Sequence, residues 1–153
     1  METIEKSAEV LNDLIAINND RIDGFDRASK DLTADDNDLK NLFTLFAQDS
    51  RRNVQELTAV VAQLGEQPDT GNTVTGTIHR AWLDVKATFS GHDRKAILAE
   101  CERGEDAIKK AYQNALTEDN GGLSSQITQL IIDQKQKIDE GHDRIKALRD
   151  SAV

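Results

Sequence analysis

Two pairs of side chains have the spacing of metal ligands on a helix. Glu102 and Glu105 stand at positions i and i+3, which places two carboxylates on one helix face. Asp139 and His142 have the same spacing and offer a carboxylate and an imidazole together. Hard divalent ions take carboxylate oxygens, and a neutral imidazole adds a stronger nitrogen donor. With Glu56 from another predicted helix, these residues are the candidate ligands for iron or another divalent metal.

The ligand set is incomplete for a di-iron bundle. Such a site takes a glutamate from each of two helices and a Glu-x-x-His motif from each of the other two. The chain contains no Glu-x-x-His motif, and residues 139–142 are its nearest relative. The polar residue that interrupts the first predicted helix is Asn18 rather than a carboxylate. A complete ferroxidase centre is therefore not expected, and no residue is assigned a catalytic role.

Five helices are predicted to position these residues, at 3–29, 36–64, 73–89, 94–116 and 123–150. Apolar residues recur along each of them at steps of three and four, the period of one helix face. Gly65 is expected to end the second helix. Four long helices with short links inside each pair predict an all-α fold, an antiparallel four-helix bundle of two hairpins. The short helix at 73–89 is the expected crossover between the hairpins, and residues 1–153 are expected to form one domain.

Polar residues interrupt the apolar stripe of every long helix. The interruptions include Asn18, Asn53, Glu105, Gln134 and His142. In an antiparallel first pair, Asn18 and Asn53 differ in height by about five residues, or ~7 Å. In the second pair, the residues that can share one layer are Glu102, Glu105, Asp139 and His142. We therefore expect the interruptions to meet at mid-bundle. Buried carboxylates normally have charge partners. The cations available to the acidic residues of this layer are Arg52, Arg80 and Arg103. The pattern favours a structural hydrogen-bond network over a metal site.

Composition and charge exclude several classes of partner. The formal net charge is −9 and no basic block offsets it, so neither nucleic acid nor an anionic membrane surface is an expected partner. The single cysteine, Cys101, lies on an apolar stripe and has no partner for an internal disulfide. The acidic N-terminus lacks the pattern of a secretory signal, and no apolar run approaches the ~20 residues that span a bilayer. A cytoplasmic location is expected, and no motif indicates a small-molecule substrate.

Five separated motifs carry a resemblance to a known family. They are LNDLI at 11–15, NDRIDGF at 19–25, HRAWLDVK at 79–86, ERGEDA at 102–107 and HDRIKALRD at 142–150. Their sequence and order resemble a bacterial family of ferritin-like four-helix-bundle proteins that forms a domain of unknown function. The resemblance implies a ferritin-like bundle, bacterial origin and distant kinship with stress-associated ferritin-like proteins. It implies that ferritin-type ligands would correspond to Glu56, Glu102, Glu105, Asp139 and His142.

Three hypotheses follow for the function. The first is a ferritin-like bundle without catalytic activity, associated with bacterial stress by resemblance, whose polar layer is structural or binds metal weakly. The second is a metal-dependent oxidase of the di-iron or di-manganese type, or an iron-handling protein, with a degenerate carboxylate and histidine site. The third is a helical interaction module that forms a homodimer through its long helix faces. The residues favour the first hypothesis.

Overall fold

The protein is helical throughout the described part of the chain. The computed structural model describes residues 2–32, 34–68, 94–118 and 123–151. They form α1 (Glu2–Asp31), the short 3-10 helix η1 (Ala34–Asp36), α2 (Asn37–Gln63), α4 (Arg94–Glu118) and α5 (Ser125–Ser151). The prediction of an all-helical fold is confirmed for these residues, which contain no strand. The helix predicted at 73–89 lies outside them.

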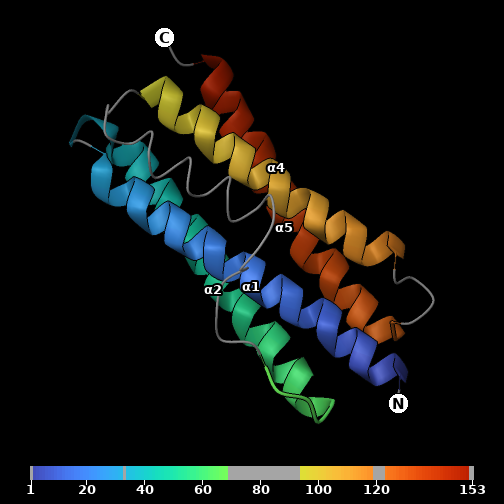
Figure 1. The fold of residues 1–153 in the computed structure, drawn as a ribbon. Helices are drawn as coiled ribbons and strands as arrows, with labels where there is room; N and C mark the ends of the chain where they lie inside the picture. The colour runs from blue at the N-terminus through green and yellow to red at the C-terminus, as the bar shows by residue number, and fades with distance from the viewer. Residues whose placement is uncertain (1, 33, 69–93, 119–122, 152–153) are drawn as a thin grey trace.

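Helices α1 and α2 form one closely packed pair (Figure 1). Near the C-terminal end of α1, the Phe25 ring packs against Phe43 in the first half of α2, with ring centroids 5.1 Å apart. Near the N-terminal end of α1, Asn12 Nδ2 donates to the carbonyl of Gln67, just beyond α2. A residue later in α1 thus contacts a residue earlier in α2, and a residue earlier in α1 contacts one just after α2. The two helices therefore run in opposite directions.

Gly65 terminates α2 through its backbone conformation. This glycine adopts a φ of +80°, a left-handed conformation that residues with a Cβ rarely take. Its N–H donates to the carbonyl of Ala62 at 3.0 Å, and the N–H of Glu66 donates to that of Val61 at 3.2 Å. These two bonds are the Schellman arrangement, which satisfies the last carbonyls of a helix. The prediction that α2 stops at Gly65 is confirmed.

Polar groups tie down the starts of the second pair, α4 and α5. Ser124 Oγ accepts a hydrogen bond from the N–H of Ile127 at 3.2 Å, which caps the first turn of α5. At the start of α4, Arg94 donates to Asp36 and Asp38, which flank the start of α2. The Arg94 guanidinium also lowers the pKa of Asp38. The beginning of α4 is therefore held against the beginning of α2.

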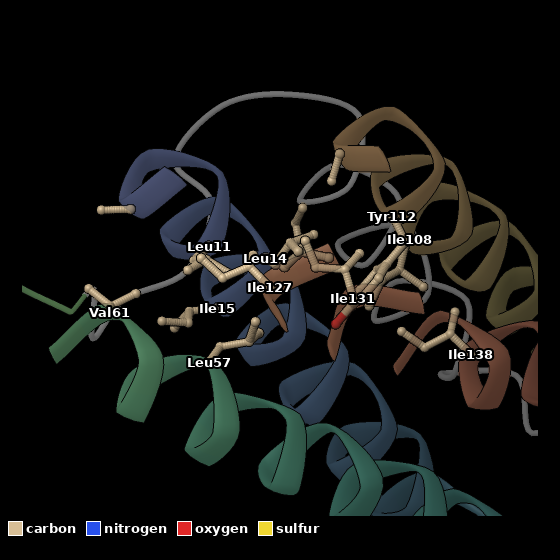
Figure 2. Packing of buried hydrophobic residues seen from close by; sticks show 13 residues of the cluster. Leu11, Leu14, Ile15, Leu57, Val61, Ile108, Tyr112, Ile127, Ile131 and Ile138 are labelled. Atoms are coloured by element: carbon tan, nitrogen blue, oxygen red, sulfur yellow. The ribbon is translucent and has the colours of Figure 1, made fainter. Parts of the chain in front are cut away.

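The buried apolar residues form two separate cores. The first, here called the phenylalanine core, contains Phe25, Ala28, Leu32, Leu39, Leu42, Phe43, Phe46, Ala47, Ile97, Leu98, Cys101 and Ile145. The second, the isoleucine core, contains Ala8, Leu11, Leu14, Ile15, Ile17, Leu57, Val61, Ile108, Tyr112, Ala115, Ile127, Ile131 and Ile138. Figure 2 shows labelled side chains from α1, α2, α4 and α5 converging in the isoleucine core. Burial of these residues is the main source of the stability of the fold.

Buried polar side chains lie between the two cores. They include Asn18 and Arg21 from α1, Ser50 and Asn53 from α2, Glu105 from α4 and Gln134 from α5. None of the six is more than 5% exposed.

Among the described residues, no helix has the length and apolarity needed to cross a membrane.

Candidate functional site

A buried ion pair between α1 and α4 lies at the centre of the polar layer. Arg21 Nε donates to Glu105 Oε1 at 2.7 Å, and Arg21 Nη2 donates to Glu105 Oε2 at 2.9 Å. The two side chains are 1% and 0% exposed. This two-point contact matches the planar guanidinium to the planar carboxylate, the strongest geometry for such a pair. The negative charge of Glu105 is therefore balanced inside the protein.

The Arg21 guanidinium makes further contacts with α2. Its Nη1 donates to Ser50 Oγ at 3.0 Å and, in a longer bond of 3.4 Å, to the carbonyl of Phe46. The rings of Phe25 and Phe46 lie 5.4 and 5.3 Å from the guanidinium carbon, within the range of cation–π attraction. Arg21 thus connects three helices while its charge stays away from water.

Asn18 is the second centre of the network and uses both ends of its amide. Its Nδ2 donates to the carbonyl of Leu14 and to the hydroxyl of Tyr112, each at 2.8 Å. Its Oδ1 accepts from Ser50 Oγ at 2.9 Å and from Asn53 Nδ2 at 3.1 Å. An amide has two donor hydrogens and two acceptor lone pairs, and all four are used here. Asn18 is therefore a fully satisfied connection between α1, α2 and α4.

The network continues through Tyr112 to the surface. The hydroxyl of Tyr112 donates to Gln134 Oε1 at 2.7 Å, and Gln134 Nε2 donates to Glu56 Oε1 at 3.0 Å. Burial raises the pKa of Tyr112 above its usual value, and the hydrogen bond from Asn18 opposes this in part. The hydroxyl therefore stays protonated, which keeps it available as a donor to Gln134.

Gly141 brings α5 close to the ion pair. A Cβ added at this position would lie 3.1 Å from Arg21 Nη2, 3.3 Å from Glu105 Oε2 and 3.4 Å from a ring carbon of Phe46. The contacts with Arg21 and Glu105 are shorter than ordinary van der Waals separations. The absence of a side chain at Gly141 thus lets the helix backbone cover the pair and keep water out.

A second group of side chains lies between α4 and α5. Single ligand atoms of Glu102, Asp106 and His142 lie within 4.8 Å of one another. His142 Nε2 contacts Asp106 Oδ1, and its Nδ1 lies 3.1 Å from Asp143 Oδ1. Arg149 Nη1 lies 2.5 Å from Glu102 Oε2 and balances its charge. One imidazole and two carboxylates can hold a divalent cation.

The five predicted metal ligands lie in several environments. Glu102 and His142 are brought together, with Asp106 as their third member. Glu105 is bound by Arg21, and Glu56 accepts a hydrogen bond from Gln134. Asp139 pairs with Lys135, one turn earlier on α5, at 2.7 Å. A metal centre made of all five residues stays a prediction.

The charge partners differ from those that the sequence indicated. Arg52 lies 3.6 Å from Asp49, Arg103 donates to Glu100 at 3.1 Å, and Arg80 lies outside the described residues. Arg21 was not among the residues that the sequence indicated as charge partners. A usable signal was present, because Arg21 follows Asn18 by three residues and precedes Phe25 by four, on the buried stripe of α1.

Cys101 has the character of a structural thiol. It is completely buried in the phenylalanine core. Burial raises its pKa well above the usual value, and the negative charges of Glu105 and Glu100 raise it further. Nucleophilic attack by cysteine requires the thiolate, which this environment disfavours. The position of Cys101 on an apolar stripe of the sequence agrees with this environment.

Comparison with known proteins identifies the family. A family model described as a domain of unknown function (DUF2383) matches residues 6–118, which include most of α1 and all of α2 and α4. No curated protein matches the chain. Because the matched segment covers well over half of the 153 residues, the chain belongs to the DUF2383 family.

Proposed function

We propose that the protein is a ferritin-like bundle without catalytic activity, whose polar layer sets the register and pairing of its helices. The observation that carries this proposal is the two-point contact between Arg21 and Glu105. Both carboxylate oxygens that a central metal would need are bound by a guanidinium. The protein thus carries an internal cation at mid-bundle.

The charge of Arg21 argues against a second cation at Glu105. At an effective dielectric constant of about 20, two unit charges about 4 Å apart interact by about 4 kcal/mol, and a divalent ion doubles that repulsion. The groups of α1 and α2 that hydrogen-bond around Arg21 and Asn18 include Ser50 and Asn53 beside Asn18 itself. They are neutral, whereas a di-iron bundle takes carboxylates from all four helices.

The network supports a role in specifying the fold. Arg21 and Asn18 reach α2 and α4 through directional bonds, and Gln134 extends the connection to α5. Apolar contacts alone tolerate sliding of one helix along another, whereas a set of directional bonds is satisfied at one register. Buried polar groups have this effect in some helical assemblies.

The ferritin-like assignment rests on the order of the helices and on the motifs. Two helix pairs, α1 with α2 and α4 with α5, are separated by a connection of 30 residues from 64 to 93. Ferritin-like folds have one such long crossover. The bacterial, stress-associated role is part of this proposal through the resemblance of the motifs.

An iron assay tests the proposal. The protein is purified without a chelating tag, loaded anaerobically with Fe(II) and then exposed to oxygen, with an established apoferritin as the positive control. We expect oxidation at the rate seen without protein. Oxidation above that rate over several equivalents of iron, reduced by Glu105→Gln in a variant that circular dichroism shows to be folded, would overturn the proposal.

A further inference from the structure

The group between α4 and α5 has a buried side and an open side. Glu102 and His142 are 8% and 9% exposed, whereas the Asp106 side chain is 60% exposed. Glu102 and Asp106 are four residues apart and therefore lie on one face of α4, with His142 across from them on α5. A cation could enter from the Asp106 side and reach the two buried ligands.

A carboxylate lies beside each ring nitrogen of His142. Its two ring nitrogens face the carboxylates of Asp106 and Asp143. A neutral imidazole has one N–H, so it can donate to only one of them. The other contact then joins two acceptors, unless a proton or a metal ion lies between them. Donation from Nδ1 to Asp143 would leave Nε2 facing Asp106, the arrangement in which carboxylates orient histidine ligands of zinc.

Glu102 provides a second and independent observation. Its Oε2 is buried, and no hydrogen bond from the described residues reaches it. Arg149 Nη1 lies 2.5 Å away and balances the charge as an ion pair. The Arg149 side chain is 34% exposed, so it can move into solvent. A metal ion at Glu102 would therefore take the place that the Arg149 guanidinium now occupies.

We propose that Glu102, Asp106 and His142 form a site for a single divalent transition-metal ion of the Zn²⁺ type. Two carboxylates and one imidazole are ligands that Zn²⁺ accepts, with water in the fourth position. Ligand atoms about 2.1 Å from a tetrahedral ion lie about 3.4 Å apart, so Asp106 would draw back from its contact with His142 Nε2 while Glu102 approaches. The exposed side chain of Asp106 makes that adjustment easy.

This site is separate from the central ion pair. Glu105 keeps its contact with Arg21, and the metal binds toward the solvent side of α4. The proposal therefore goes beyond a structural role for the polar layer and does not require oxidation chemistry. It also replaces Asp139 of the predicted ligand set by Asp106.

A Zn²⁺ titration with matched asparagine variants tests the proposal. The probes are Zn²⁺, followed by calorimetry, and Co²⁺, followed by its visible spectrum, on metal-free protein without a chelating tag. We expect one equivalent to bind, with affinity reduced at least about tenfold by Asp106→Asn and by His142→Ala. Asp139→Asn is the control, because it changes the same chemical group one turn from His142 and should leave the affinity unchanged.

Three results would overturn the proposal. The first is that Zn²⁺ does not bind, which would mean that the group holds only a proton. The second is Zn²⁺ binding that Asp106→Asn leaves intact. The third is Zn²⁺ binding that Asp139→Asn weakens as much as Asp106→Asn does. Since Asp106 is exposed, its variant should fold, which circular dichroism checks. Success or failure here is independent of the iron assay, because Zn²⁺ is not oxidised by oxygen.

Discussion

Arg21 of α1 holds Glu105 of α4 through two parallel hydrogen bonds of 2.7 and 2.9 Å, in a place closed to solvent. Removing two charges from water costs several kcal/mol for each, and their attraction offsets this only when the geometry is good and the remaining polar atoms are satisfied. Here Ser50 and the carbonyl of Phe46 accept from the third guanidinium nitrogen, Nη1. The attraction therefore roughly offsets the desolvation cost. The pair adds little net stability, and its main effect is to specify how α1 packs against α4.

We predict that breaking the pair is far more damaging than replacing it. Glu105→Leu or Arg21→Met alone should lower the free energy of unfolding by about 3–5 kcal/mol, because each leaves a buried charge without its partner. The double variant should recover most of that loss, since apolar side chains of similar volume are often neutral or stabilising in such positions. Urea unfolding followed by circular dichroism measures all three values.

A surface pair provides the control for this cycle. Arg51 of α2 and Asp26 of α1 form an ion pair at 2.6 Å, but their side chains are 49% and 43% exposed. Substituting either should change the free energy of unfolding by less than about 1 kcal/mol. If the single variants of Arg21 and Glu105 lose as little stability as those of Arg51 and Asp26, then breaking the central pair does not leave a buried charge without compensation, and the prediction is wrong.

Gly141→Ala should destabilise the protein, although the same change in an exposed helix stabilises by about 0.5–1 kcal/mol. The added Cβ would meet Arg21 Nη2 at 3.1 Å and Glu105 Oε2 at 3.3 Å, and neither atom can retreat without stretching its hydrogen bonds. We expect a net loss of about 1 kcal/mol in thermal or urea unfolding.

The Gly141 prediction is sharpened by repeating the change in the Arg21→Met/Glu105→Leu background. If the crowding comes from the ion pair, the alanine should cost less there than in the wild-type protein. An equal cost in both backgrounds would assign the crowding to Phe46 or to the backbone instead. A stabilising Gly141→Ala would contradict the close approach of α5.

Local patterns were sufficient to predict the helical elements. The steps of three and four in apolar residues indicated the long helices, and Gly65 indicated the end of α2. The polar interruptions at Asn18, Asn53 and Gln134 were visible for the same reason, because a polar residue on an apolar stripe stands out in one helix. These features depend on residues close together in the chain.

The partners across helices could not be predicted in the same way. Glu105 and Asp106 are neighbours in sequence but differ by 100° around the helix axis, so small helix rotations decide which one faces α1 and which faces His142. The spacing of Glu102 and Glu105 suggested a shared face toward α5. In the structure Glu105 faces Arg21, and Glu102 shares its side with Asp106. Long-range packing fixes that rotation.

Tyr112 gives a prediction for alkaline pH. Burial raises its pKa in the folded protein above the unfolded value of about 10. A raised pKa means that the folded state binds this proton more tightly than the unfolded state does. The contribution to stability is therefore complete below about pH 10 and is lost as the pH rises above it. Because Tyr112 is the single tyrosine, phenolate absorbance reports on it alone. The phenolate absorbance should appear above pH 10 only as the helical circular dichroism signal is lost.

The matched variant is Tyr112→Phe, which keeps the ring in the isoleucine core and removes the hydroxyl. Asn18 Nδ2 then loses an acceptor and Gln134 Oε1 loses a donor, both in buried positions. We expect a loss of about 1–3 kcal/mol at neutral pH, because buried polar atoms without partners keep their desolvation penalty. The decline of stability above pH 10 should be shallower than in the wild type, since the titrating group is gone. Phenolate absorbance that rises near pH 10 while the wild-type helices remain intact would show instead that the hydroxyl is open to water and that the network is not closed.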